Sequence, residues 1–452
     1  MNLAENSTNN PAYILYTSGS SGKPKGVMVS LEGFLNFLEA IPRIIPFEKG
    51  NSIACFTSIS FDISLMEIVL ELVSGMNLIL ADDDERKNPK SLINILNTFG
   101  VDLLQMTPSM LKMLRVYHNN NWDFLNKVKI LMLGGEKLTD DLLLDIRNNA
   151  SCMIFNMYGP TETTIWSTVS NLSNKEKVDI GEPILNTSLY IVDDNNRPVE
   201  PGTEGELLIA GKGLAVGYVN APELTASKFI QLEFGNQERA YKTGDLCKYD
   251  ELGRLLYIDR KDNQVKINGH RIELDEIEYL VKQDNSISDA VVCVDENKIL
   301  CFYKTDIDVD VNKIREDLKT FLPEYMIPNR FIRVEKFEYT ISNKIDKKLL
   351  ISRFHEDFES LNKTHIDSTT ISPIEKIVMS VFSEAAELDE SEVELDIKIE
   401  DLGIDSIQFV SFIVELEEEF GFEFDEEYLN IKEFTVLKDI VKYIDKRVNV
   451  NG

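Results

Sequence analysis

The amino-acid sequence predicts three structural units in succession: a large α/β unit, a small α+β unit and an all-α unit. In residues 1–262, short β-type runs alternate with amphipathic helical runs, which is typical of an α/β fold. Residues 263–355 hold a smaller mixture of strand-like and helix-like runs. In residues 373–452 the apolar residues recur at helical spacing, and residues 356–372 form a polar segment that we interpret as a linker.

Each predicted element rests on its own pattern. Residues 12–17 and 129–133 are β-rich runs, and so are residues 189–192 and 206–209. Helical periodicity marks four segments of the large unit, at residues 31–41, 63–73, 91–98 and 109–117. The small unit is expected to contain helices near residues 275–282 and 311–321 and strands at 290–294 and 299–303. Ser372 and Pro373 are a typical start for the first helix of the last unit.

Composition and charge exclude several functional classes. The 452 residues include 47 basic and 77 acidic side chains, a net charge of −30, which argues against nucleic acid or an anionic membrane as the main partner. Residues 1–10 do not resemble a signal peptide, and no apolar run has the length of a membrane span. The five scattered cysteines predict reduced, buried thiols in a cytoplasmic protein.

Residues 13–26, YILYTSGSSGKPKG, form a glycine-rich segment after a strand-like run. Glycine lets the backbone approach an anion closely, hydroxyl groups donate hydrogen bonds to it, and lysine supplies charge. The segment is not a P-loop of the GxxxxGK[ST] type, because Lys23 is followed by Pro24. A flexible surface turn is the alternative interpretation of such a cluster.

The segment resembles the phosphate loop of the adenylate-forming enzymes, which include acyl-CoA synthetases, luciferases and the adenylation domains of nonribosomal peptide synthetases. Further motifs of that family follow in the expected order: FDIS at 61–64, NMYGPTE at 156–162, GEL at 205–207 with GLAVGY at 213–218, YKTGDL at 241–246, RKDNQVKINGHRIEL at 260–274 and SNKID at 342–346. Val216 and Asn343 depart from the usual arginine and glycine. The peptide-synthetase branch fits best.

The resemblance implies an ATP- and Mg²⁺-dependent reaction that joins an amino acid to AMP. The expected phosphate-loop residues are Thr17, Ser18, Gly19, Ser20, Ser21, Gly22 and Lys25. Around the adenine the resemblance places Tyr158 with Gly134, Gly135, Glu136, Asn156, Met157 and Gly159. Thr161 would contact the α-phosphate and Glu162 would bind Mg²⁺. Asp245 would bind the ribose, with Tyr257 and Arg260 nearby.

Three residues are expected to carry the catalytic cycle. Lys344 would bridge the substrate carboxylate and the α-phosphate, although the residues alone suggest an exposed lysine. Asp262 matches the hinge about which the small unit rotates, and a solvated loop aspartate is the alternative. Asp62 would pair with the α-ammonium group of the amino acid, and a helix N-cap is the alternative.

The family's selectivity positions suggest a short substrate pocket, and so a small amino acid, most simply glycine, with alanine or another small residue left open. These positions are Asp62, Ile63, Met66, Gln105, Met132, Gly134, Met157, Ile165, Trp166 and Lys344. Most of them are bulky, although methionine adapts its shape easily.

The last unit resembles a peptidyl carrier domain with a four-helix bundle. LGIDSI at 402–407 precedes an apolar-periodic helix and resembles the attachment site at which Ser406 carries 4′-phosphopantetheine. A helix N-terminus suits a phosphate group, but Asp405 and Ser406 are also ordinary N-cap candidates. The unit holds 22 acidic and seven basic residues, half of the net charge. A phosphopantetheinyl transferase is an implied partner.

We therefore expect an adenylation–carrier didomain that lacks the usual N-terminal segment of the adenylation domain. The sequence contains no HHxxxDG condensation motif and no GxSxG thioesterase motif, so condensation or thioesterase domains would act in trans. One alternative is an inactive adenylation region with a working carrier that is loaded in trans. A third reading, an acyl-CoA or aryl ligase, is disfavoured by Asp62 and the fused carrier.

Overall fold

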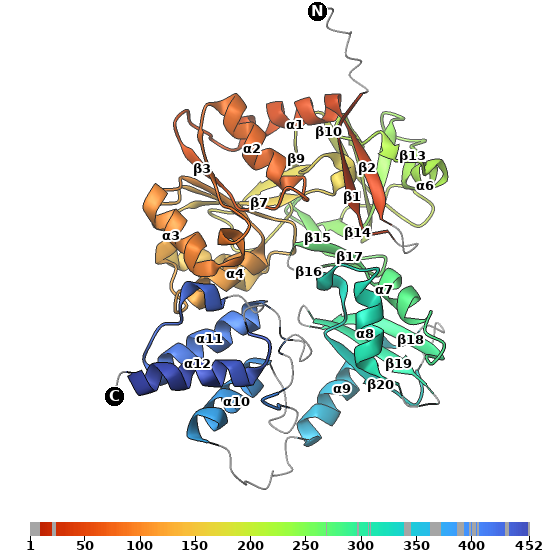
Figure 1. Cartoon of the computed structure of the whole chain (residues 1–452). Helices are drawn as coiled ribbons and strands as arrows, with labels where there is room; N and C mark the ends of the chain where they lie inside the picture. The colour runs from red at the N-terminus through yellow and green to blue at the C-terminus, as the bar shows by residue number, and fades with distance from the viewer. Residues whose placement is uncertain are drawn as a thin grey trace, which may run out of the picture.

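Figure 1 shows the computed structural model of the chain. The structure describes residues 10–19, 24–267, 269–295, 298–305, 307, 309–338, 345–361, 372–386, 393–396, 399, 404, 406–429 and 434–450. Within these residues the chain forms a large α/β unit, a small α+β unit and a helical unit, which is the predicted fold class. The small unit and the helical unit lie side by side below the large unit in Figure 1.

A seven-stranded sheet is the centre of the large unit. Its strands follow the order β4 (Asn77–Leu80), β3 (Ser52–Cys55), β5 (Leu103–Met106), β6 (Ile130–Gly134), β7 (Met153–Tyr158), β8 (Thr168–Asn171) and β9 (Glu182–Pro183). The first five strands run parallel, and β8 and β9 are antiparallel. Every residue of β3, β5 and β6 is buried, as expected for parallel strands covered on both faces.

Helices connect these strands: α1 (Leu31–Ile44), α2 (Ile63–Ser74), α3 (Pro89–Phe99), α4 (Pro108–Tyr117) and α5 (Asp140–Asn149). Four of them start at a side chain that accepts hydrogen bonds from the first-turn amides, namely Ser30, Asn88, Thr107 and Thr139. Three 3₁₀ helices lie in this unit: η1 (Glu85–Lys87), η2 (Asp123–Leu125) and η3 (Thr161–Thr163).

Two antiparallel sheets complete the large unit. One consists of β1 (Pro11–Thr17), β2 (Lys25–Ser30) and β12 (Gly217–Tyr218). The other consists of β10 (Thr187–Val192), β11 (Gly205–Gly211), β14 (Arg239–Tyr249), β13 (Phe229–Gln231) and β15 (Leu255–Arg260), and α6 (Pro222–Lys228) precedes β13. These sheets bring β1, β14 and β15 to the same end of the large unit as the small unit (Figure 1).

The small unit starts with a hairpin of β16 (Gln264–Ile267) and β17 (His270–Glu273). Gly269 in its turn has a φ of +80°, a conformation that glycine adopts easily. The helix α7 (Leu274–Val281) follows, and then the remaining elements β18 (Asp289–Asp295), β19 (Lys298–Lys304), α8 (Val311–Lys319), η4 (Glu324–Met326), β20 (Arg330–Arg333) and α9 (Lys347–Leu361). Strands β18, β19 and β20 form one sheet.

The helical unit contains α10 (Pro373–Ala386), α11 (Ser406–Phe420), η7 (Glu426–Leu429) and α12 (Leu437–Val450). Its core includes Phe382 and Phe412, whose rings pack edge to face at 5.1 Å. The unit also contacts the large unit, because Val410 of α11 belongs to the large unit's core while Tyr117 of α4 packs against the helical core. Lys90 pairs with Glu423 at 3.3 Å across the same contact.

Two expectations can be compared directly with these elements. All five cysteines are free and buried, which confirms the prediction of buried thiols. The predicted linker at 356–372 differs, because α9 continues to Leu361. The reason is visible in the sequence, where Leu350, Phe354 and Phe358 recur every four residues. They extend a helical pattern past residue 355, where the predicted small unit ends.

Candidate active site

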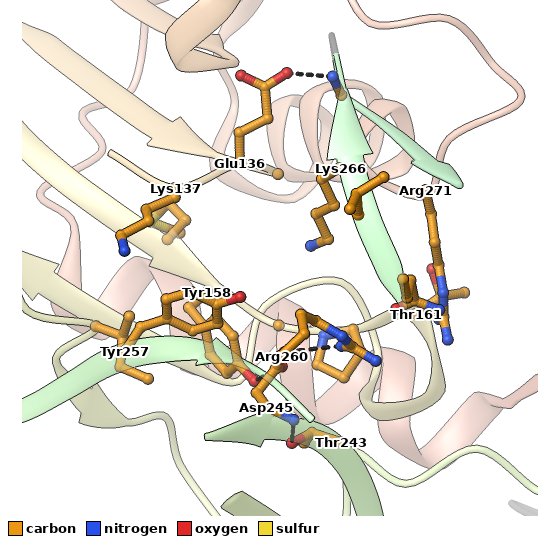
Figure 2. Close-up of a pocket in the computed structure, with 18 of the residues that line it drawn as sticks. Glu136, Lys137, Tyr158, Thr161, Thr243, Asp245, Tyr257, Arg260, Lys266 and Arg271 are labelled. Carbon is orange, nitrogen blue, oxygen red and sulfur yellow. Dashed lines mark hydrogen bonds and ion pairs between the residues drawn. The ribbon is translucent and has the colours of Figure 1, made fainter. Parts of the chain in front are cut away.

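One cavity of about 840 Å³ lies between the large unit and the hairpin β16–β17 (Figure 2). Most residues predicted to bind the substrates line it: Thr17, Ser18, Asp62, Ile63, Gly135, Glu136, Asn156, Met157, Tyr158, Gly159, Thr161, Ile165, Trp166, Asp245, Tyr257 and Arg260. They come from six separate segments of the sequence, so the fold brings together what the motifs leave far apart.

Other predicted residues lie behind the cavity wall or elsewhere. Those outside the lining are Gly19, Lys25, Met66, Gln105, Met132, Gly134, Glu162 and Asp262. Ser20, Ser21, Gly22 and Lys344 fall outside the residues that the structure describes. Ser406 is the first residue of α11 in the helical unit.

Asp245 organises one polar end of the cavity (Figure 2). Its two carboxylate oxygens accept hydrogen bonds from Tyr158 Oη at 2.5 Å and from Arg260 Nη1 at 2.7 Å, and its own amide donates to Thr243 Oγ1 at 3.0 Å. Burial, with the nearby Asp245 charge, raises the pKa of Tyr158 well above its ordinary value, so the phenol stays a donor. The result is a fixed carboxylate with aromatic rings beside it, because Tyr257 also lines this end.

Asp262, the predicted hinge, is tied to this cluster through Arg260. The guanidinium donates from Nε and Nη2 to the two Asp262 oxygens, both at 2.8 Å. Burial alone would raise the pKa of Asp262, but the hydrogen bonds from Arg260 hold that pKa below its ordinary value. Arg260 therefore links Asp245 to Asp262, which lies just before the β16–β17 hairpin.

Asp62 lies at the start of α2 and lines the cavity, and one of its two carboxylate oxygens, Oδ2, is unsatisfied. It is 8% exposed, makes no capping hydrogen bond to α2, and its Oδ2 has no hydrogen-bond partner among the described residues. Burial raises the pKa of Asp62 to about 6, while Thr161 and the charge of Lys266 act in the opposite direction. The N-cap alternative therefore does not account for Asp62, and a buried acceptor remains free for a cationic group.

Glu162 is the central charged group next to the phosphate-loop end of the cavity, and it is fully buried on η3. Arg271 Nη1 donates to its Oε1 and Oε2 at 3.0 and 2.9 Å, and Tyr218 Oη donates to Oε1 at 2.8 Å. Lys25 Nζ is 3.9 Å from Oε1. Burial alone would raise the pKa of Glu162, but the charges of Arg271 and Lys25 lower it to about 2.

Replacing Glu162 with glutamine is expected to lower the free energy of unfolding by about 3 kcal/mol, because it leaves a buried cation without its counter-charge. The folded-state pKa is depressed, so the contribution of Glu162 is complete above pH 4.5, the ordinary value, and is lost as the pH falls towards 2. Chemical denaturation of both proteins at pH 7 and at pH 3 measures this. A difference that does not shrink at pH 3 would contradict it.

The residues present do not fit a Mg²⁺ ion at Glu162 in this arrangement. Both carboxylate oxygens are already hydrogen-bonded to Arg271, and a second cation would be repelled by Arg271 and Lys25. Among the described residues, no group of three or more histidine, cysteine, aspartate or glutamate side chains is placed to hold a metal ion.

Trp166 closes the predicted amino-acid pocket. Its ring lies over Gly134, where a Cβ atom would be 2.5 Å from Trp166 Cη2. Trp166, Ile165 and Met157 line the cavity, whereas Met66, Gln105 and Met132 lie behind them and are not lining residues. Bulky side chains therefore form this part of the cavity wall.

Sequence reasoning missed several cavity residues from the hairpin. Lys266 and Arg271 are cross-strand partners and both side chains reach the cavity, as Figure 2 shows. His270 also lines it and stacks on Tyr325 with ring centroids 3.7 Å apart. The signal was present, because Asn-Gly at 268–269 between two alternating runs is typical of a tight hairpin.

Glu136 connects the hairpin to the large unit. Its Oε1 accepts a hydrogen bond from the Gly269 amide, and its Oε2 accepts one from the Ser109 amide at 3.0 Å. The carboxylate thus joins the hairpin turn to the first turn of α4.

Comparison with protein families identifies two regions. Residues 2–219 match the AMP-binding enzyme family, and residues 376–444 match the phosphopantetheine attachment site. In the part of the chain that the structure describes, no helix is both long and apolar enough to cross a membrane.

Curated relatives include the dimodular nonribosomal peptide synthase of Bacillus subtilis, 34% identical over 92% of this chain, and bacitracin synthase 3 of Bacillus licheniformis, 38% identical over 75%. The chain spans only 17% and 5% of the lengths of these two relatives.

Solved structures give the same result. Holo-PA1221, a protein with adenylation and PCP domains bound to a vinylsulfonamide inhibitor, matches 91% of this chain and 69% of its own, with a TM-score of 0.76 and 25% identity. The adenylation domain AlmE of Vibrio cholerae, in complex with glycyl-adenosine-5′-phosphate, matches 78% of this chain and 68% of its own, with a TM-score of 0.70 and 25% identity. The four-domain synthetase AB3403, bound to AMP and glycine, matches 97% of this chain and 32% of its own, with a TM-score of 0.52 and 30% identity.

Proposed function

Because the chain consists of a nonribosomal peptide synthetase adenylation domain fused to a phosphopantetheine carrier domain, we propose that it activates a small amino acid, glycine, with ATP and loads it on Ser406. The proposed boundaries are residues 1–262 and 263–355 for adenylation, 356–372 for the linker and 373–452 for the carrier.

In the proposed first step the amino-acid carboxylate attacks the α-phosphate of ATP and pyrophosphate leaves. Asp245 accepts hydrogen bonds from the ribose, and Tyr158 and Tyr257 offer rings for the adenine. Lys344 would offset the repulsion between the two reacting anions, and catalysis consists mainly of positioning and charge stabilisation. The proposed step does not use a Mg²⁺ ion at Glu162, because both carboxylate oxygens of Glu162 are already hydrogen-bonded to Arg271.

The buried Asp62 carboxylate, whose Oδ2 has no hydrogen-bond partner among the described residues, is the observation that carries the proposal. A buried, ionisable acceptor without a partner costs free energy unless a ligand satisfies it. The α-ammonium group of an amino acid would do so and would lower the raised pKa of Asp62 back towards its ordinary value. An aryl or fatty acid has no such group.

Glycine is supported by the shape of the pocket and by two of the similar structures. Trp166 covers Gly134 and lines the cavity with Ile165 and Met157, and Met66, Gln105 and Met132 are not lining residues. AlmE was solved with glycyl-adenosine-5′-phosphate and AB3403 with AMP and glycine. Alanine or another small residue remains the nearest alternative substrate.

Replacing Trp166 with alanine is expected to open the pocket to larger side chains. The ratio of kcat/KM for leucine to that for glycine should rise about tenfold or more, because shape complementarity discriminates by about that much per methylene group. A substrate panel in the ATP–pyrophosphate exchange assay measures the ratio. Loss of glycine exchange without any gain for larger amino acids would contradict this account of the pocket.

In the proposed second step the carrier accepts the aminoacyl group. Ser406 begins a 15-residue helix, and a helix N-terminus favours the phosphate of a phosphodiester. The 4′-phosphopantetheine group supplies the thiol that takes the aminoacyl group as a thioester. A phosphopantetheinyl transferase would attach that group, and neighbouring synthetase modules would take up the product.

Glycine-dependent exchange of pyrophosphate into ATP is the direct test of the adenylation claim. The full chain is incubated with ATP, labelled pyrophosphate and each of the twenty amino acids, and we expect the highest rate with glycine. A folded chain that shows no exchange with any amino acid would disprove the enzymatic function.

A further inference from the structure

Two consecutive β-branched residues in the turn after η3 have backbone angles that such residues rarely adopt. Thr164 has a φ of +68° and Ile165 has a φ of +63°. Among the described residues, every other position with a positive φ is occupied by glycine, asparagine or glutamine. A branched Cβ crowds the backbone in this left-handed region, so the turn costs free energy and persists only where its surroundings hold it.

The base of this turn is fixed by contacts between residues that are close in the sequence. The Ser167 amide donates a hydrogen bond to the Tyr158 carbonyl oxygen at 2.8 Å. The hydroxyl oxygens of Thr163 and Ser167 are hydrogen-bonded to each other at 2.6 Å, and both residues are buried. These contacts close the turn on either side of residues 164–166, so its tip needs a contact of its own.

The side chain of Thr164 supplies that contact. Thr164 is fully buried, and its Oγ1 donates a hydrogen bond to the Gly213 carbonyl oxygen at 2.6 Å. Gly213 opens the GLAVGY motif, which the proposed reaction steps do not use. The Ala215 amide of the same motif donates to the Glu162 carbonyl oxygen at 2.8 Å. The motif therefore runs along the strained turn and holds it at two points.

The two residues after Thr164 form part of the proposed amino-acid pocket. Ile165 and Trp166 line the cavity, whereas Thr164 does not. The Trp166 ring covers Gly134, and its Nε1 is 3.4 Å from Gln105 Oε1, which is long for an N–H donor. Because the backbone angles of the turn set the direction of both lining side chains, relaxation of the turn to ordinary angles would move them away from Gly134.

We propose that Thr164 is a positioning residue that determines amino-acid selectivity from outside the cavity: its hydroxyl group ties the strained turn to Gly213 and so holds Ile165 and Trp166 at the substrate. The proposal rests on the proposed function, because it names what keeps the pocket for a small amino acid in shape. A merely structural hydroxyl group would stabilise the fold without changing which amino acid is preferred.

The ATP–pyrophosphate exchange assay with glycine and alanine tests the selectivity. Thr164→Val keeps the size and the branching of the side chain but cannot donate to the Gly213 carbonyl group. We expect the ratio of kcat/KM for alanine to that for glycine to rise about tenfold, roughly the discrimination that one methylene group allows. The KM for ATP should stay within twofold of the wild type. An unchanged ratio, with or without a loss of activity, overturns the proposal.

Two further variants serve as controls. Thr164→Ser keeps the hydroxyl group and should keep the ratio within twofold, so a rise equal to that of Thr164→Val overturns the proposal. Thr305→Val is the matched control, because Thr305 is buried in the small unit, does not line the cavity and donates from Oγ1 to the Ser286 carbonyl oxygen at 2.7 Å. An equal rise in this variant also overturns the proposal. If Thr164→Val does not fold, Thr164→Ala replaces it, with the same expected direction.

Tryptophan fluorescence gives a second readout that needs no substrate. The sequence contains two tryptophans, Trp122 and Trp166, so Trp122→Phe leaves only Trp166 to emit. Trp166 is 1% exposed, and we expect Thr164→Val in this background to raise acrylamide quenching at least twofold, whereas Thr305→Val leaves it unchanged. Equal quenching in all these proteins overturns the proposal. Failure of the proposed function looks different: the wild type shows no exchange with any amino acid, yet Thr164→Val still raises the quenching.

Discussion

Replacing Asp62 with asparagine is expected to lower kcat/KM for glycine in the exchange assay by about 100-fold, which corresponds to about 2.7 kcal/mol. The reason is that a neutral amide cannot replace the charged partner of a buried ammonium group. The KM for ATP should change little, since the proposed nucleotide site is at Asp245, at the other polar end of the cavity. Asp259→Asn, at an exposed position that also lines the cavity, is the control.

The raised pKa of Asp62 predicts that kcat/KM for glycine depends on pH. The groups that face Asp62 are Thr161 and Glu162 from η3, Lys266 from β16 and Tyr13 from β1. Because the pKa of Asp62 is raised to about 6, kcat/KM for glycine should fall as the pH drops below 6, where the carboxyl becomes neutral. The effect of Asp62 on the free energy of unfolding has the opposite sign. The fold disfavours the ionised carboxylate, so Asp62→Asn should be more stable than the wild type at pH 7. The variant should lose that advantage below pH 4. An activity profile that is flat between pH 5 and 7 would contradict the assignment.

Replacing Ser406 with alanine is expected to abolish loading completely and to leave pyrophosphate exchange within twofold of the wild type. Without the hydroxyl oxygen no phosphodiester to phosphopantetheine can form, whereas the cavity is built from other residues. Intact mass spectrometry after incubation with coenzyme A and a phosphopantetheinyl transferase measures the modification. Ser411→Ala, on the same helix, is the control and should be modified normally.

This variant pair also separates the main proposal from the carrier-only alternative. If the wild type is modified at Ser406 but shows no exchange with any amino acid, the chain acts as a carrier that is loaded in trans. If the Ser406→Ala chain still gains mass, another residue carries the group and the assignment of Ser406 is wrong.

Much of the fold could be predicted because local patterns and burial agree. The run at 129–133 predicts a buried strand, and β6 occupies Ile130–Gly134 between two parallel neighbours. The periodic run at 109–117 predicts α4, which begins at Pro108 and is capped by Thr107 Oγ1. Helix α9 was not predicted, and it runs into the segment interpreted as a linker, because polar side chains conceal a helical repeat that continues to Leu361.

The cavity was less predictable because it depends on pairing between distant segments. Motifs identify Asp245 and Glu162, but no local pattern shows that Tyr158 donates to Asp245 or that Arg271 neutralises Glu162, at separations of 87 and 109 residues. For Glu162 the resemblance implies a Mg²⁺ ligand, and no local pattern shows that Arg271 already pairs with it. The counter-ion is supplied by a different unit of the fold.

The helix α4 has a consequence for the reach of the carrier. Its first turn is joined through Ser109 and Glu136 to the cavity, and Tyr117 at its other end packs against the helical unit. Ten residues at 1.5 Å each make α4 about 15 Å long. The helix is thus a rigid spacer between the cavity proposed to activate the amino acid and the helical unit proposed to receive it. A residue inserted in α4 would turn its far end by about 100°, the rotation of one helical residue, and would move the carrier's contact face to a different side.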